Sequence, residues 1–164
     1  MTARKFIGQL RYNLNDIPGE YRTLAMHDER IAGILLNQGE YRHATYFLVQ
    51  SMEKHVRATI YTRVDPNNAY YRERTRTHDV DALLTFLLEI IDVDDTVRAT
   101  IQQQLDSHVL AETRFGTLHN DLRYLKYSDR HQSYSMLTVD MHDALHARER
   151  LQVLKRFLGD MTRL

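Results

Sequence analysis

The chain has 164 residues, 43% of them hydrophobic and 27% charged, which fits one soluble domain around a single core and excludes a disordered chain. Lysine plus arginine (22) balance aspartate plus glutamate (22), so the chain has no overall positive field, and any contact with nucleic acid requires a local basic patch. The absence of cysteine excludes disulfides, thiolate metal sites and cysteine nucleophiles.

No stretch has the character of a targeting or membrane segment. The opening residues, MTARKFIGQLRYNLND, lack the continuous apolar core of a signal peptide. No apolar run approaches the roughly 20 residues that cross a bilayer as a helix. We therefore expect a cytoplasmic protein that does not contact a membrane.

The scarcity of helix breakers indicates a helical protein. Only two prolines and six glycines occur in the chain, which favours long helices over a sheet of many strands. Residues 1–20, which end in the turn-like segment DIPGE, are predicted to form an N-terminal extension or a short helix. Residues 21–164 are predicted to form the helical bundle, and no repeat or linker divides them.

Apolar residues at steps of three and four predict the first two long helices. The first is expected to begin near Tyr21 and to stop at Gly39. The second is expected over residues 40–63. The residues expected to face the core are Leu24, Ile31, Ile34 and Leu35 in the first helix, and Ala44, Phe47, Leu48, Met52, His55, Val56 and Thr59 in the second.

A polar segment and a strongly apolar helix follow. Residues 64–77, VDPNNAYYRERTRT, break the periodicity at Pro66 and are expected to form an exposed basic loop. A helix is then predicted over residues 78–91. Its expected core face consists of Val80, Leu83, Leu84, Leu87, Leu88 and Ile91.

The second half of the chain is predicted to hold two more helices. The first, over residues 97–122, has a stripe that turns polar towards its end, and Gly116 is the place where it is expected to bend or end. Residues 126–135, KYSDRHQSYS, are expected to form a polar loop before a last helix over residues 138–158. The whole predicts an all-α fold, an antiparallel up-and-down bundle of four to five helices.

The segment LLNQGEYRHATYFLVQSMEKHVRATI resembles the opening helix pair of the HEPN superfamily (higher eukaryotes and prokaryotes nucleotide-binding domains). The family's third helix often starts with THDL, and this chain has THDV; a later Arg-Tyr pair of the family matches LRYLKYSDR. The resemblance covers roughly residues 24–160 in order and spacing. The matching residues are Gly39, Tyr41, Ala44, Phe47, Gln50, Glu53, Lys54, Thr77, His78, Asp79, Val80, Arg123 and Tyr124.

The resemblance implies a HEPN-like bundle that commonly forms a homodimer. Many members are ribonucleases of toxin or defence systems, with an arginine four to six residues before a histidine near the dimer interface. Other members lack that motif and bind nucleotides or accompany a small nucleotidyltransferase. For this chain, the resemblance therefore implies RNA or a nucleotide as ligand, and a nucleotidyltransferase or an antitoxin as a candidate partner.

Two arginine–histidine pairs have the ribonuclease spacing: Arg114 with His119, and Arg72 with His78. The family's catalytic pair lies on a late helix, which favours Arg114 and His119. A histidine moves a proton near neutral pH and a cation holds the scissile phosphate, so this chemistry needs no metal. On a straight helix the two residues diverge by about 140°, so a two-fold axis would have to bring Arg114 of one subunit towards His119 of the other. The alternative is a surface arginine and a hydrogen-bonded interface histidine.

Further polar residues are candidates for nucleotide or RNA binding. Glu53 and Lys54 are expected to shape a polar cleft or, alternatively, to form a structural ion pair, for example with an arginine of the predicted long helix. The basic segment before the third helix is expected either to grip phosphate or to be a solvated charge run. The predicted binding set is Glu53, Lys54, Arg72, Arg74, Arg76, His78 and Arg123.

No metal or cofactor is predicted. His142 and His146 in HDALH imitate a zinc-peptidase motif, but they lack its glutamate base and a third ligand, so coincidence is the better interpretation. A set formed by His108, Glu112 and His119 shares one face of the predicted long helix, and it has the ligand types for a metal or for a polar interface network.

Three hypotheses follow from these patterns. The first is a HEPN-type RNA-cleaving or RNA-binding homodimer. The second is a non-catalytic HEPN module that binds a nucleotide or a nucleotidyltransferase through the region of Glu53 and Lys54. The third is a helical adaptor whose polar stripe is a protein interface. The exposure of His119, and its distance from a guanidinium, should distinguish the first hypothesis from the others.

Overall fold

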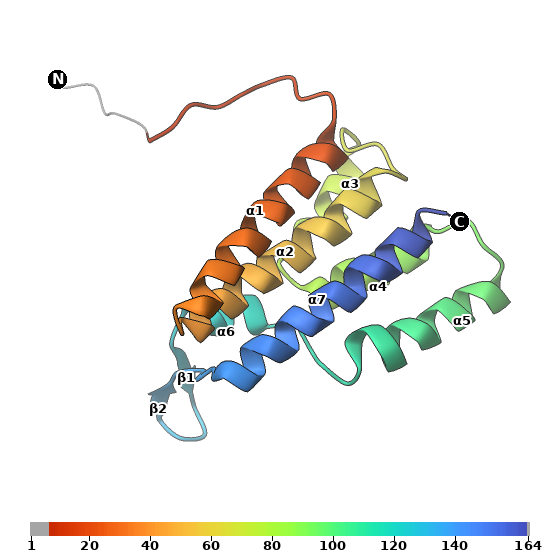
Figure 1. Ribbon diagram of the computed structural model, residues 1–164. Helices are drawn as coiled ribbons and strands as arrows, with labels where there is room; N and C mark the ends of the chain where they lie inside the picture. Colours follow the sequence, from red (N-terminus) through yellow and green to blue (C-terminus); the bar gives the residue numbers. More distant parts are fainter. Residues whose placement is uncertain (1–6, 164) are drawn as a thin grey trace.

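The structure is a computed structural model that describes residues 7–163, and it is mostly helical with one small hairpin (Figure 1). The predicted all-α fold is confirmed. No helix within residues 7–163 is both long and apolar enough to cross a membrane. The elements are α1 (Ile17–Asn37), α2 (Tyr41–Tyr61), α3 (Ala69–Arg74), α4 (Val80–Ile90), α5 (Asp95–Gln104), the π-helix η1 (Leu105–Leu110), α6 (Leu118–Arg123), β1 (Lys126–Ser128), β2 (Ser133–Ser135) and α7 (Met141–Met161).

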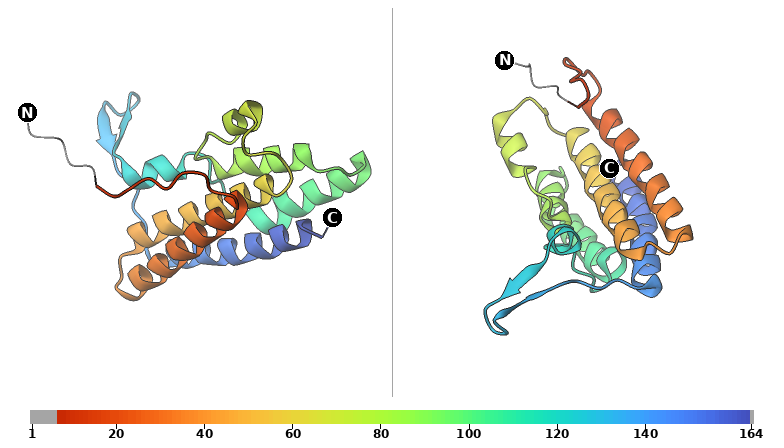
Figure 2. Two further views of the ribbon diagram at one scale, coloured as in Figure 1. Left: turned by 90° about the horizontal axis from the view of Figure 1, so that it is seen from above. Right: turned by 90° about the vertical axis from the view of Figure 1, so that its left-hand side faces the viewer.

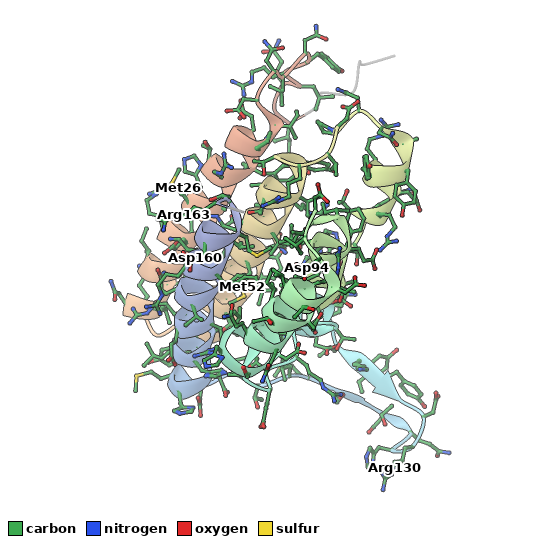
Figure 3. All side chains as sticks on the ribbon, turned by 90° about the vertical axis from the view of Figure 1, so that its right-hand side faces the viewer. Met26, Met52, Asp94, Arg130, Asp160 and Arg163 are labelled. Atoms are coloured by element: carbon green, nitrogen blue, oxygen red, sulfur yellow. The ribbon has the colours of Figure 1, made fainter. Side chains whose placement is uncertain are left out.

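Helix α2 is the centre of the fold. It contacts α1, α4, α6 and α7, and it lies between α1 and α4 in the right-hand view of Figure 2. Gly39, at φ 77°, takes the left-handed turn that reverses the chain between α1 and α2. Met52 points into the interior, whereas Met26 of α1 lies on the outer surface (Figure 3). A central helix of this kind can present different side chains to two sides of the protein.

The apolar face of α4 packs as its periodicity predicts, but that of α1 does not. Leu83, Leu84 and Leu87 of α4 are buried. Leu24 and Ile34 of α1 were expected in the core and are instead 48% and 45% exposed. The face that meets α2 is turned by one residue: the small, fully buried residues Ala25 and Ala32 lie there and allow the two helices to approach closely.

The prediction of one long helix over residues 97–122 is wrong. Helix α5 passes into the π-helix η1, and Ala111 and Glu112 then adopt left-handed φ values of 45° and 65°. Arg150 of α7 donates hydrogen bonds to the carbonyls of His108 and Val109 at 2.8 and 3.2 Å, so a side chain satisfies the free helix end. The chain turns back, and α6 reaches α2. His108, Glu112 and His119 therefore do not share a helix face.

Three other segments differ from expectation. Helix α1 begins at Ile17, because Asp16 caps it and Pro18 fits the first turn, so DIPGE starts a helix and does not end an extension. The basic segment 64–77 contains the short helix α3. The segment 126–135, expected as a polar loop, is a hairpin in which Tyr127 pairs with Tyr134.

Candidate functional site

A buried ion pair on α2 is the base of the candidate site. Glu53 and Arg57 are one helical turn apart, and Nε and Nη2 of Arg57 donate to Oε1 of Glu53 at 3.1 and 2.9 Å. Their side chains are only 5% and 11% exposed. Arg57 also donates to the carbonyls of Thr75 and Thr77. The pair therefore fixes the segment before α4 against α2.

His78 lies above this pair, just before α4. Asp79 caps the helix by accepting from the amide of Ala82 at 3.0 Å, which sets the position of His78. Nδ1 of His78 is 3.1 Å from Oε2 of Glu53, and the side chain is 59% exposed. Within residues 7–163, Nε2 of His78 makes no hydrogen bond. A carboxylate thus orients an exposed imidazole and favours the tautomer whose hydrogen is on Nδ1.

His119 of α6 completes the cluster from beneath. Its ring stacks on that of His78, with centroids 4.1 Å apart and planes at 4°. Nδ1 is 2.6 Å from Nε2 of Gln50, and Nε2 is 3.2 Å from Nη1 of Arg123. The residue is 2% exposed, and its neighbours are polar and aromatic groups, including the ring of Tyr46 at 5.6 Å. His119 is buried among polar partners and close to a guanidinium, that of Arg123.

The contacts of His119 require a neutral ring. A neutral imidazole has one N–H and one acceptor nitrogen, whereas a guanidinium only donates. Nε2 therefore accepts from Arg123, which a doubly protonated imidazolium could not do. Burial, followed by the neighbouring His78, lowers the pKa of His119 below its usual 6.5, although Glu53 acts in the opposite direction. His119 is therefore a neutral ring that supports His78.

The rim of the cluster is cationic and aromatic. Lys54 forms an ion pair with Asp28 of α1. The guanidinium of Arg123 lies 5.0 Å from the ring centroid of Tyr124, which is 56% exposed, and 5.9 Å from that of Tyr46. Three cations, Lys54, Arg57 and Arg123, stand against the carboxylates of Glu53 and Asp28. The local balance is positive and suits an anionic ligand with a flat ring.

The same residues are poor ligands for a metal ion. Within residues 7–163, one nitrogen or oxygen from each of Glu53, His78 and His119 lies within 4.8 Å of the others. However, Arg57 holds the carboxylate and Arg123 holds an imidazole nitrogen, so a cation would have to displace or face two guanidinium groups.

The zinc-like HDALH segment has structural contacts. Asp140 and Asp143 form a capping box at the start of α7. His146 hydrogen-bonds to Thr113 with 2.8 Å between Nε2 and Oγ1. Asp143 and His146, two of the residues that imitate the motif, therefore have structural contacts.

The structure brings together five of the residues predicted to bind or to catalyse: Glu53, Lys54, His78, His119 and Arg123. The other four lie elsewhere. Arg72 donates to the carbonyl of Asn67, and Arg74 pairs with Glu89 at 2.5 Å and lies over Phe86. Arg76 and Arg114 are exposed, and neither makes a side-chain hydrogen bond within residues 7–163.

Sequence reasoning missed three members of the cluster, namely Arg57, Tyr46 and Asp28. Glu53 pairs with Arg57 of its own helix and not with an arginine of the predicted long helix. The spacing of four residues was an available indication of that pair. Tyr46 and Asp28 carried no such indication, because their partners are His119 and Lys54, which the fold brings from other elements.

Comparisons with protein-family models, with curated proteins and with solved structures found no match for this chain.

Proposed function

We propose that this chain is a HEPN-type helical protein that binds a nucleotide at the cluster of Glu53, His78, His119 and Arg123. The observation that carries the proposal is that an exposed, carboxylate-oriented His78 and the guanidinium of Arg123 both contact His119, next to a buried ion pair. Three of these residues, Glu53, His78 and Arg123, come from three distant segments that are quoted for the HEPN resemblance.

Each half of a nucleotide has a complementary group at this cluster. A phosphate carries acceptor oxygens that match the planar fork of Arg123, and Lys54 adds a second positive charge nearby. A base has a flat face that can stack on the exposed rings of His78 or Tyr124; such stacking is worth about 1–3 kcal/mol per base. The buried Glu53–Arg57 pair holds this platform rigid before the ligand arrives.

Calorimetric titration of the full chain with ATP tests the proposal. Arg123→Gln should weaken binding about ten-fold or more, because it removes a charge-assisted contact. Arg130→Gln is the matched control, because Arg130 projects from the tip of the hairpin, away from the helices (Figure 3). Equal affinity of wild type and Arg123→Gln, or no binding by the wild type, would overturn the proposal.

The second candidate function is metal-independent RNA cleavage by a homodimer. It is favoured by the 3.1 Å contact between Glu53 and Nδ1 of His78, which leaves Nε2 as a proton carrier at the surface. In this form of the proposal His78 moves the proton and His119 supports it. The pair Arg114 and His119 stays the alternative, and it requires Arg114 of a second subunit.

RNA incubated with the protein in the presence of EDTA separates these alternatives. Loss of cleavage in His78→Asn, with retention in Arg114→Gln, supports His78. Loss in both Arg114→Gln and His119→Asn, with an intact helical spectrum, supports the predicted pair. No cleavage by the wild type removes the catalytic proposal and leaves nucleotide binding.

A further inference from the structure

A second polar site lies on the opposite side of α2. A helix turns about 100° per residue, so His55 lies about 160° around the axis from Glu53. On that side, α1, α2 and α7 line a cavity of about 290 Å³ that is open to solvent. Its polar lining comes from Arg22 of α1, from His55 and Thr59 of α2, from Lys155 of α7 and from Thr162, which follows α7.

The cavity carries more positive than negative charge. Arg22 makes no hydrogen bond or ion pair within residues 7–163, and Lys155 pairs with Glu29 at 2.7 Å. Glu29 also accepts from Gln152 at 2.7 Å, so its charge is shared between two donors. Two cations thus face one carboxylate. An anion that enters the cavity gains an unpaired guanidinium and a lysine that has protons left to donate.

A buried nitrogen in the cavity wall lacks a partner. Nε2 of His55 is inaccessible to solvent and makes no hydrogen bond. Buried polar atoms are nearly always hydrogen-bonded, so each exception needs an explanation. A nitrogen that water cannot reach has no room beside it for a ligand atom, so His55 forms part of the cavity wall and does not contact a ligand through Nε2.

We infer that this cavity binds a small phosphate-bearing anion, with Arg22 and Lys155 on its oxygens and His55 in the wall beside them. Two such cations hold phosphate oxygens in a pocket, and they would repel a metal ion. The cavity is open to solvent, and its volume of about 290 Å³ admits a phosphate together with a short organic group. The site is distinct from the cluster proposed to bind a nucleotide.

The test is a titration of the full chain with inorganic phosphate and, separately, with glycerol 3-phosphate, at an ionic strength held constant with sodium chloride. We expect saturable binding and a shift of the His55 ring resonances in NMR spectra. Lys155→Met and Arg22→Gln should each weaken binding about ten-fold or more. Arg156→Gln, one residue along α7 and exposed, should bind as the wild type does.

Gly159→Val serves as a second route, since it fills the cavity without changing its charge. It should weaken binding even if the charge variants are unstable. Tighter binding of glycerol 3-phosphate assigns the ligand as a phosphomonoester, and tighter binding of inorganic phosphate assigns the free ion; both support the site. Non-saturable binding, an unshifted His55, or equal affinity in the wild type, Lys155→Met and Gly159→Val would overturn it.

Discussion

The two sides of α2 use similar side chains in different ways. On the Glu53 side, the buried carboxylate has a guanidinium and an imidazole as partners, and the buried His119 has a contact at each ring nitrogen. On the His55 side, a buried nitrogen has no partner and Arg22 has no carboxylate within residues 7–163. On the Glu53 side the buried groups satisfy one another and, within residues 7–163, leave Nε2 of His78 and further N–H groups of Arg123 for a ligand, whereas on the His55 side the guanidinium of Arg22 is itself unpaired.

The largest expected effect of a single substitution is that of Arg57→Leu. It leaves the buried carboxylate of Glu53 without its guanidinium, and we expect the free energy of unfolding to fall by about 3–5 kcal/mol in urea denaturation. The double variant Glu53→Leu/Arg57→Leu should recover much of this loss, because an apolar pair replaces both charges. A loss below about 1 kcal/mol in the single variant would show that the pair does not stabilise the fold.

The pH dependence of stability should reflect both sides of α2. Burial is the first cause that lowers the pKa of His119 and of His55 below 6.5. Between pH 6.5 and the lowered pKa values of the folded protein, the unfolded chain therefore binds more protons than the folded protein. The free energy of unfolding should decrease as the pH falls through this range.

Urea denaturation between pH 7 and pH 5 measures that slope. His119→Gln and His55→Gln should each flatten it, and the exposed His131→Gln, in the hairpin loop, should leave it unchanged. An equal slope in the wild type and in both variants would contradict the assignment of these two histidines.

Gly159→Ala should stabilise the protein by about 0.5–1 kcal/mol, because alanine is the better residue inside a helix and its Cβ meets nothing within 4 Å. Thermal unfolding measures the change. A lower melting temperature would show that the cavity wall is tighter than its geometry indicates.

Lys155→Met should have the smallest effect on the free energy of unfolding of the protein without ligand. The pair with Glu29 is partly exposed, at 34% and 27%, and such a pair contributes about 0.2–1 kcal/mol. The same urea titration measures it, and a loss as large as that of Arg57→Leu would remove the proposed difference between the two sides.

The sequence predicts those parts of the fold that depend on local periodicity. Helices α2 and α4 and the burial of Leu83 and Leu87 follow from steps of three and four residues. The break at Ala111 and Glu112 could not be predicted, because alanine favours a helix and the turn depends on Arg150, about 40 residues later. The core face of α1 was assigned to its large residues, whereas close packing against α2 selects its alanines.

The candidate site was predicted in its residue types and not in its geometry. Glu53, His78 and Arg123 belong to recognisable motifs, but their meeting point requires α6 to fold back onto α2. The role proposed for His119 changes, for the same reason, from a proton carrier to a support for His78. Only the fold places its ring against that of His78, where it is 2% exposed.

The most direct test of the account is an NMR titration of the nine imidazole rings with ATP. If the cluster on the Glu53 side of α2 is a nucleotide site, the ring resonances of His78 shift saturably in the wild type and in Arg130→Gln, and fail to do so in Arg123→Gln. A His78 ring that stays unchanged while ATP saturates the protein would contradict the central claim.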